Sequence, residues 1–103
     1  MRQRRRYIAF ELIGGEAGKG DIMRAIGYTI YTYNPAFDRG MLKLVFHDVS
    51  SRRGLLRCGH RQVGELRVAM ASIKKIGGRK ASLVILGVSG TLRAAKRKFL
   101  VPA

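Results

Sequence analysis

The segment from Ser89 to Phe99 combines residue types that can bind an anion. Ser89, Gly90 and Thr91 follow an apolar run, and a Ser or Thr here can cap a helix and leave its first amides pointing outward. Such amides carry partial positive charge and bind phosphate. The helix expected next also carries four cations: Arg93, Lys96, Arg97 and Lys98. This pattern predicts a phosphate site beside a basic helix face; the alternative is an ordinary cap before a solvated helix.

The charge balance of the chain favours a polyanionic partner. The 103 residues include 21 Lys and Arg but only 6 Asp and Glu, which gives a net charge of +15. Residues 49–103 hold 13 of these cations and a single acid, Glu65. A thermophilic surface would balance such cations with acids in ion-pair networks. Nucleic acid is therefore the expected partner, ahead of an acidic membrane surface. Further candidate contacts are Arg53, Arg57 and Arg61.

The glycine-rich segment 14–21 looks at first like a nucleotide-binding loop. The phosphate-binding loop of nucleotide hydrolases needs four residues between its first Gly and its Gly-Lys pair, then a Ser or Thr for magnesium. Here only three residues separate Gly14 from Gly18, and Gly20 stands where the hydroxyl is required. We interpret this segment as a flexible turn, with Asp21 capping the helix that follows.

Candidate metal and catalytic residues are few. If the two middle strands pair, Cys58, His60, His47 and Asp48 could lie together, and Cys-x-His is part of some zinc sites. They could equally be a buried thiol and two surface imidazoles. The six carboxylates are scattered, and no spacing implies an acid–base pair. We expect neither a cofactor bound by the protein nor independent hydrolase activity.

Strands are expected where apolar residues alternate or run together. In the first of them, Ile8, Phe10 and Leu12 alternate with Ala9 and Glu11, which is the period of a half-buried strand. The last is nearly continuous apolar sequence, as in a central strand. The expected strands span residues 5–14, 41–48, 53–59 and 80–88.

Helices are expected between these strands and after them. Pro35 ends the first helix, Gly77-Gly78 closes the second, and Pro102 stops the third. Gly87 and Gly90 allow the tight turn before the third helix. The expected helices span residues 21–33, 60–75 and 91–100.

The order β-α-β-β-α-β, followed by a helix, is that of the split βαβ pattern. We therefore predict an α+β sandwich of the ferredoxin-like, RNA-recognition type, in one domain over residues 7–101. A basic arm over residues 1–6 precedes it. The chain has no internal repeat, no export signal and no apolar run long enough to span a membrane, so the cytoplasm is the expected location.

The third predicted strand lacks the rings on which RNA-recognition domains stack bases. Arg53-Gly54 begins this strand as such domains require, but Leu55, Leu56 and Arg57 follow where aromatic residues are needed. The sheet is therefore expected to pack against another protein or to bind RNA through charge.

Two segments, GLLRCGHRQVGELRVAMA and LGVSGTLRAAKRKFL, resemble the archaeal ribonuclease P protein component 2 family. That family is related to a protein shared by eukaryotic ribonuclease P and ribonuclease MRP. The resemblance covers about half of the chain, closest over 54–73 and 83–100, and the opening YIAFEL is similar too. Region 27–43 departs from the family pattern, in which a longer helical hairpin precedes the second strand.

This resemblance implies an accessory role in removing the 5′ leader from precursor tRNA. The catalytic centre would belong to ribonuclease P RNA, which uses magnesium, and the protein would hold that RNA by its phosphates. The implied partners are ribonuclease P RNA, a TIM-barrel protein subunit and a second copy of this chain, with precursor tRNA as substrate. The alternatives are a ribosomal or general RNA-binding protein and a ligand-sensing domain, although a small ligand does not require a charge of +15.

Overall fold

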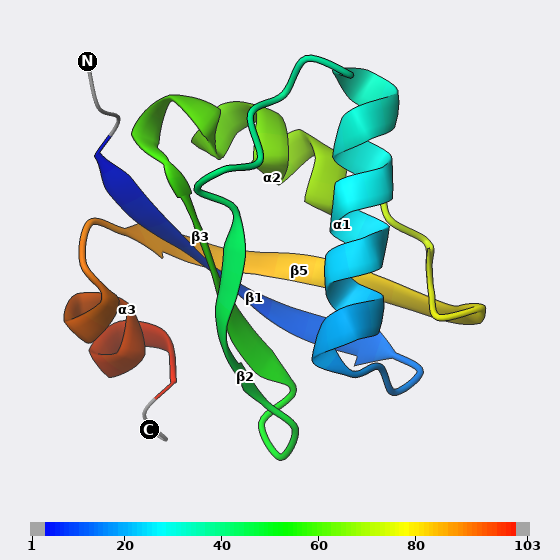
Figure 1. Ribbon diagram of the computed structural model, residues 1–103. Coiled ribbons are helices and arrows are strands. Elements are labelled where there is room, and N and C mark those ends of the chain that lie inside the picture. Colours follow the sequence, from blue (N-terminus) through cyan, green and yellow to red (C-terminus); the bar gives the residue numbers. More distant parts are fainter. Residues whose placement is uncertain (1–3, 101–103) are drawn as a thin grey trace.

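A five-stranded antiparallel sheet forms the centre of the molecule, with helices on both of its faces (Figure 1). The computed structural model describes residues 4–100. The elements are β1 (Arg5–Gly14), α1 (Lys19–Tyr33), β2 (Lys43–Asp48), β3 (Arg53–Gly59), the 3₁₀ turn η1 (His60–Gln62), α2 (Val63–Ala71), β4 (Lys75–Ile76), β5 (Arg79–Ser89) and α3 (Leu92–Phe99). Strands lie in the order β2-β3-β1-β5-β4. The expected mixed α+β architecture is confirmed, with the short strand β4 as an addition.

No helix within residues 4–100 is long and apolar enough to span a membrane.

The larger core lies between the sheet and helices α1 and α2. Ile8, Phe10 and Leu12 alternate along β1 and point into this core, as their spacing predicts. Helix α1 buries one face built from Ile22, Ile26 and Ile30. Because these apolar residues recur every four positions, they form a single stripe along the helix.

A smaller core lies on the opposite face of the sheet, under α3. Its buried residues are Tyr7, Ala9, Leu55 and Ala95. Strand β1 is consequently buried on both faces over part of its length, although its alternation indicates a half-buried strand. Since α3 covers part of this face, the sheet is not open to solvent beneath the helix (Figure 1).

Gly87 lies inside β5 and not in the turn before α3, which corrects the sequence interpretation. It pairs with Ala9 next to a β-bulge. A Cβ atom at Gly87 would lie 2.5 Å from Phe99 Cζ, so only glycine lets the Phe99 ring pack this closely on the strand. The absence of a side chain at Gly87 therefore helps to seat α3.

The second helix is shorter than expected, and Gly77-Gly78 does not close it. Helix α2 ends at Ala71, and Gly77 and Gly78 form the turn between β4 and β5 with φ of 60° and 79°. Ile73 and Ile76 are both buried beyond the helix end, so packing of this segment against the core replaces the last helical turn.

Helix α1 begins two residues earlier than expected. Gly18 occupies the N-cap position, where no side-chain hydrogen bond is made. Asp21 lies within the first turn and pairs with Arg24, so the expectation that Asp21 caps the helix is wrong. A carboxylate in the first turn still interacts favourably with the helix dipole.

The glycine-rich loop between β1 and α1 is held by Arg52. The Arg52 guanidinium donates hydrogen bonds to the carbonyls of Leu12 at 2.9 Å, Gly14 at 2.6 Å and Gly15 at 3.1 Å. Arg52 itself has φ of 61°, a left-handed conformation that costs energy for a residue with a side chain. The loop is therefore fixed by a distant arginine, where the sequence suggested a flexible turn.

Part of the expected basic arm belongs to the sheet. Arg5 and Arg6 pair with Gly59 and Cys58 at the start of β1. Residues 1–3 of the arm lie outside the described residues, as does Pro102, the expected stop of the last helix.

Candidate nucleic-acid interface

The start of α3 is capped as predicted by Thr91. Its Oγ1 accepts a hydrogen bond from the Ala94 amide at 3.1 Å. The first turn of α3 has no acidic residue. Ser89, the other candidate cap, is instead buried at the end of β5, where it pairs with Tyr7. The cap therefore places exposed Gly90 and Thr91 at the helix end that favours anions.

Helix α3 separates its cations from its apolar residues. Ala95 is fully buried, while Leu92 and Phe99 pack against the smaller core. The four cations lie on the exposed side: Arg93, Lys96, Arg97 and Lys98. The predicted division of this helix into a core-facing stripe and a basic face is confirmed.

Lys96 has a defined position on this basic face. Its Nζ lies 5.4 Å from the centroid of the Phe46 ring, within the range of a cation–π contact. The ring belongs to β2, so this contact joins α3 to the edge strand of the sheet. Lys96 as a whole residue nevertheless remains exposed.

Arg6 joins the α3 cap from the first strand. A Cβ atom at Gly90 would lie 3.7 Å from Arg6 Nη1, so this guanidinium stands beside the turn that starts α3. Arg6 also donates to the carbonyl of Arg5 at 2.9 Å. Sequence reasoning missed Arg6 as a member of this site, because residues 6 and 90 meet only through the pairing of β1 with β5.

Arg4, which precedes β1, lies close to η1. The amide of His60 donates to the carbonyl of Arg4 at 2.7 Å, and the Arg4 amide donates to His60 Nδ1 at 3.1 Å. Arg61 is exposed on the same turn. We call the basic surface at this end of the molecule the α3 basic end. It consists of Arg4, Arg6, Arg61, Gly90, Thr91 and the four α3 cations.

Two of the predicted contact residues have partners within the fold. Arg53 Nε donates to Glu11 Oε1 at 3.0 Å, and its Nη1 donates to the carbonyl of Phe99 at 2.7 Å. Arg57 Nε donates to the carbonyl of Met41 at 3.2 Å. Arg53 therefore fastens the end of α3 to the sheet, a role that its position in the sequence does not indicate.

The candidate metal ligands do not form a cluster. Within residues 4–100, no group of three or more His, Cys, Asp or Glu side chains could hold an ion. Cys58 is buried in the larger core, and this burial raises the pKa of its thiol to about 11. Burial, Lys19 and Arg52 together lower the pKa of His47, although Asp48 opposes them.

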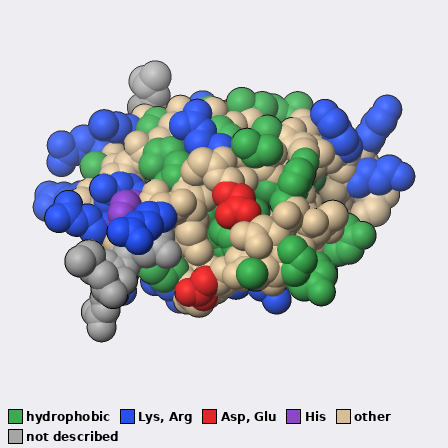
Figure 2. All heavy atoms as spheres, turned by 90° about the horizontal axis from the view of Figure 1, so that it is seen from above, with side chains coloured by type: hydrophobic (Ala, Val, Ile, Leu, Met, Phe, Trp, Pro, Cys, Tyr) green, Lys and Arg blue, Asp and Glu red, His purple; other side chains and the backbone are tan. Residues whose placement is uncertain are grey.

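Basic side chains gather at two ends of the molecule. Figure 2 shows Lys and Arg side chains at both ends of the face in view, with acidic side chains between them. One is the α3 basic end, near the start of β1. The other is the β4–β5 hairpin, which carries Lys74, Lys75, Arg79 and Lys80, all exposed. The sequence analysis did not single out this hairpin.

Comparison with known proteins identifies the family. Residues 6–100 match the family model described as the Rpp14/Pop5 family. The chain belongs to the Rpp14/Pop5 family. A Rpp14/Pop5 relative from Thermococcus gammatolerans, named Ribonuclease P protein component 2, is 37% identical over 103 residues, covering 97% of this chain and 86% of the relative. A protein of the same name from Methanosarcina acetivorans is 34% identical over 101 residues, covering 97% of this chain and 76% of that protein.

The Rpp14/Pop5 fold is also found in a solved structure. A chain in the cryo-EM structure of yeast Ribonuclease MRP aligns with a TM-score of 0.67 at 12% sequence identity. The alignment covers 90% of this chain and 79% of the yeast chain. At this identity the likeness concerns the fold alone. The resemblance to the archaeal ribonuclease P protein component 2 family, seen in about half of the sequence, is confirmed and extends over nearly the whole chain.

Proposed function

We propose that this protein is an RNA-binding subunit of ribonuclease P, which assists a catalytic RNA in removing the 5′ leader from precursor tRNA. The observation that carries this proposal is the match over 97% of the chain to relatives named Ribonuclease P protein component 2. The net charge of +15 supports it, because phosphate contacts supply much of the affinity between proteins and nucleic acids. The RNA, with its magnesium ions, performs the cleavage, and the protein binds no cofactor directly.

The α3 basic end is the proposed RNA contact. Arg93, Arg97 and Lys98 are exposed, and Arg6 stands beside Gly90 at the helix start. The strand order β2-β3-β1-β5 supports a ferredoxin-like, RNA-recognition-type assignment. In RNA-recognition domains the sheet face stacks bases, whereas here α3 covers part of a sheet face. Contact through phosphates therefore suits this chain better than base stacking on the sheet.

The protein works within a larger assembly under this proposal. Its partners are ribonuclease P RNA, a TIM-barrel protein subunit and a second copy of the chain, all acting in the cytoplasm. Precursor tRNA is the substrate of the assembly. A single domain over residues 7–101 supplies these contacts.

Cleavage of precursor tRNA tests the proposal. Ribonuclease P RNA and the TIM-barrel subunit are incubated at limiting magnesium with and without this chain. We expect cleavage to depend on the chain, because its cations reduce the magnesium needed to fold the RNA. An unrelated basic protein at equal charge concentration is the control. If that control stimulates equally, or if this chain has no effect with an active partner, the proposed role is wrong.

A further inference from the structure

The β4–β5 hairpin carries a second set of cations, far from α3. Lys74, Lys75, Arg79 and Lys80 are exposed within seven residues, and no acid follows Glu65 in the chain. Ion pairs among the described residues join Arg24 to Asp21 and Arg53 to Glu11, and neither pair uses a hairpin cation. Figures 1 and 2 place the hairpin at the opposite end of the molecule from α3. The molecule is 38 Å long, so one short RNA segment would not reach both ends easily.

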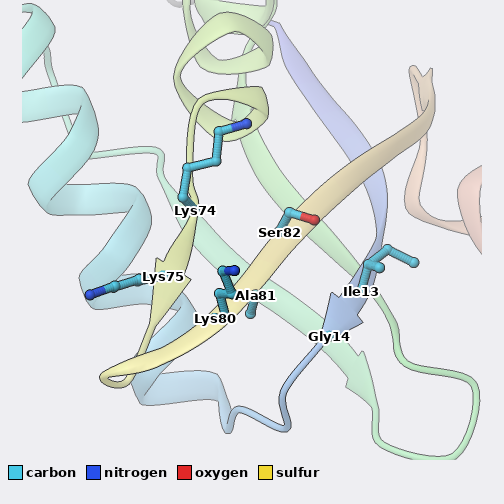
Figure 3. A pocket seen from close by; sticks show the side chains of 7 residues that line it. All are labelled: Ile13, Gly14, Lys74, Lys75, Lys80, Ala81 and Ser82. Carbon is cyan, nitrogen blue, oxygen red and sulfur yellow. The ribbon is translucent and has the colours of Figure 1, made fainter.

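A shallow cavity of about 390 Å³ opens beside this hairpin. Its surface is mainly apolar and includes Ile13, Gly14 and Ala81. Ile13 is 43% exposed although it is a large apolar residue at the end of β1. Figure 3 shows Lys74, Lys80 and Ser82 around this cavity, with Lys75 directed away from Lys74. The cavity therefore combines an apolar floor with cations and one hydroxyl group at its edge.

These features fit one class of ligand. A base and its sugar present flat, weakly polar surface, while the attached phosphate is anionic, so an unpaired nucleotide matches an apolar floor edged by lysines. A paired base cannot enter the cavity because it is stacked within the duplex. The cavity volume falls within the range usual for small-molecule sites.

We propose that the hairpin cavity binds an unpaired nucleotide of the RNA, with its phosphate at Lys74 and Lys80 and its base against the exposed side chain of Ile13. This inference rests on the proposed function, because it assigns a second contact to the same RNA. Ser82 Oγ provides one hydrogen-bonding group for the base edge or the 2′-hydroxyl. The protein thus contacts two RNA segments, a phosphate-rich one at α3 and an unpaired one at the hairpin.

Acidic residues line a second depression, on the side of the hairpin that faces α1. Glu16 and Asp21 line a separate depression with Gly77 and Arg79, toward α1. Arg79 lines this depression together with the two carboxylates. Lys75 also lines the cavity, but its side chain is directed away from Lys74. Lys74 and Lys80 remain as the cations that define the phosphate position.

Fluorescence anisotropy of the full-length chain tests this site with a labelled ten-nucleotide single-stranded oligouridylate and a duplex RNA of the same length. Lys74→Ala with Lys80→Ala removes two charges at the cavity, and Ile13→Ser alters the floor without changing charge. The control, Arg39→Ala with Arg67→Ala, removes two exposed charges, one from the loop between α1 and β2 and one from α2. Thermal unfolding first confirms that each variant is folded.

We expect the lysine variant to bind the single strand about tenfold more weakly, and the control less than twofold more weakly. Ile13→Ser should weaken single-strand binding about threefold and leave duplex binding unchanged. Equal losses in the lysine variant and the control would overturn the site, because only overall charge would matter. Unchanged single-strand binding by Ile13→Ser would overturn the nucleotide cavity.

A second readout separates this inference from the proposed function. Methyl NMR signals of Ile13 and Ala81 are followed during titration with oligouridylate and, separately, with the TIM-barrel subunit. Shifts on adding RNA are expected. Shifts caused by the protein partner alone would make the cavity a protein interface and reject the inference. If the chain stimulates precursor cleavage while these variants behave as wild type, the inference fails and the proposed function stands. If the chain gives no stimulation, the proposed function itself fails.

Discussion

At the scale of single residues, Arg52 contributes to the stability of the fold by holding the β1–α1 loop. Arg52→Ala removes three hydrogen bonds to the β1–α1 loop and should lower the free energy of unfolding by about 3 kcal/mol. Arg52→Gly removes the same bonds but accepts the left-handed backbone, so it should be about 1 kcal/mol less destabilising than Ala. Urea unfolding of both variants measures the difference. Small, equal effects would show that the loop does not depend on Arg52.

His47 should make stability depend on pH. Its pKa is lowered in the folded protein, mainly by burial, and its Nε2 is a buried atom without a hydrogen-bond partner. Above pH 6.5 the side chain is neutral in both states and contributes no pH dependence. As the pH falls below 6.5, the unfolded chain takes up the proton first, so the free energy of unfolding decreases.

The matched variant His47→Gln isolates this effect from the other charges. Urea unfolding at several values between pH 7.5 and pH 5 should show a steeper loss of stability for wild type than for the variant. Parallel curves would mean that His47 titrates alike in the folded and unfolded chain.

At the scale of elements, the seating of α3 depends on Gly87 and Phe99 together. Gly87→Ala places a methyl group against the Phe99 ring and should destabilise the protein by about 2 kcal/mol. Phe99→Ala removes a half-buried ring and should cost about 2 kcal/mol, less than for a fully buried ring.

The double variant tests whether these two residues act as a pair. Since Phe99→Ala removes the clash, Gly87→Ala should add little in that background, and the two losses should not sum. Thermal or urea unfolding of all three variants gives the coupling energy. Additive losses would show that the ring moves aside and that Gly87 does not set the position of α3.

At the scale of the whole molecule, the proposed binding to RNA should depend mainly on charge. If about six cations meet phosphates, log affinity should fall with log salt at a slope of roughly −4 to −5. Arg93→Ala with Arg97→Ala should weaken binding to ribonuclease P RNA and reduce the size of the slope by about 1.5, with little change in stability.

Arg39→Ala with Arg67→Ala serves as the control, because it removes the same charge from the α1–β2 loop and from α2. Filter binding across a salt series measures both variants. A slope that changes equally in the two would place the RNA contact away from α3.

The sequence by itself determined the order of the main elements and the excess of basic residues on the last helix. Alternating Ile8, Phe10 and Leu12 predicts β1, and the spacing in 92–99 predicts a basic helix, since these patterns depend on neighbours along the chain. The sequence left its cap open between Ser89 and Thr91, and the structure selects Thr91. The excess of cations over acids likewise requires no structure to favour RNA.

Only the tertiary structure decided which distant residues meet. Arg6 reaches Gly90, Arg53 holds the end of α3, and Phe99 packs on Gly87, all through contacts far apart in sequence. Gly77-Gly78 shows the same limit: a glycine pair is equally compatible with a helix end and a hairpin turn, and burial of Ile73 and Ile76 selects the hairpin. The local sequence pattern indicates which face of an element is apolar, whereas strand pairing and packing determine which residues cover that face.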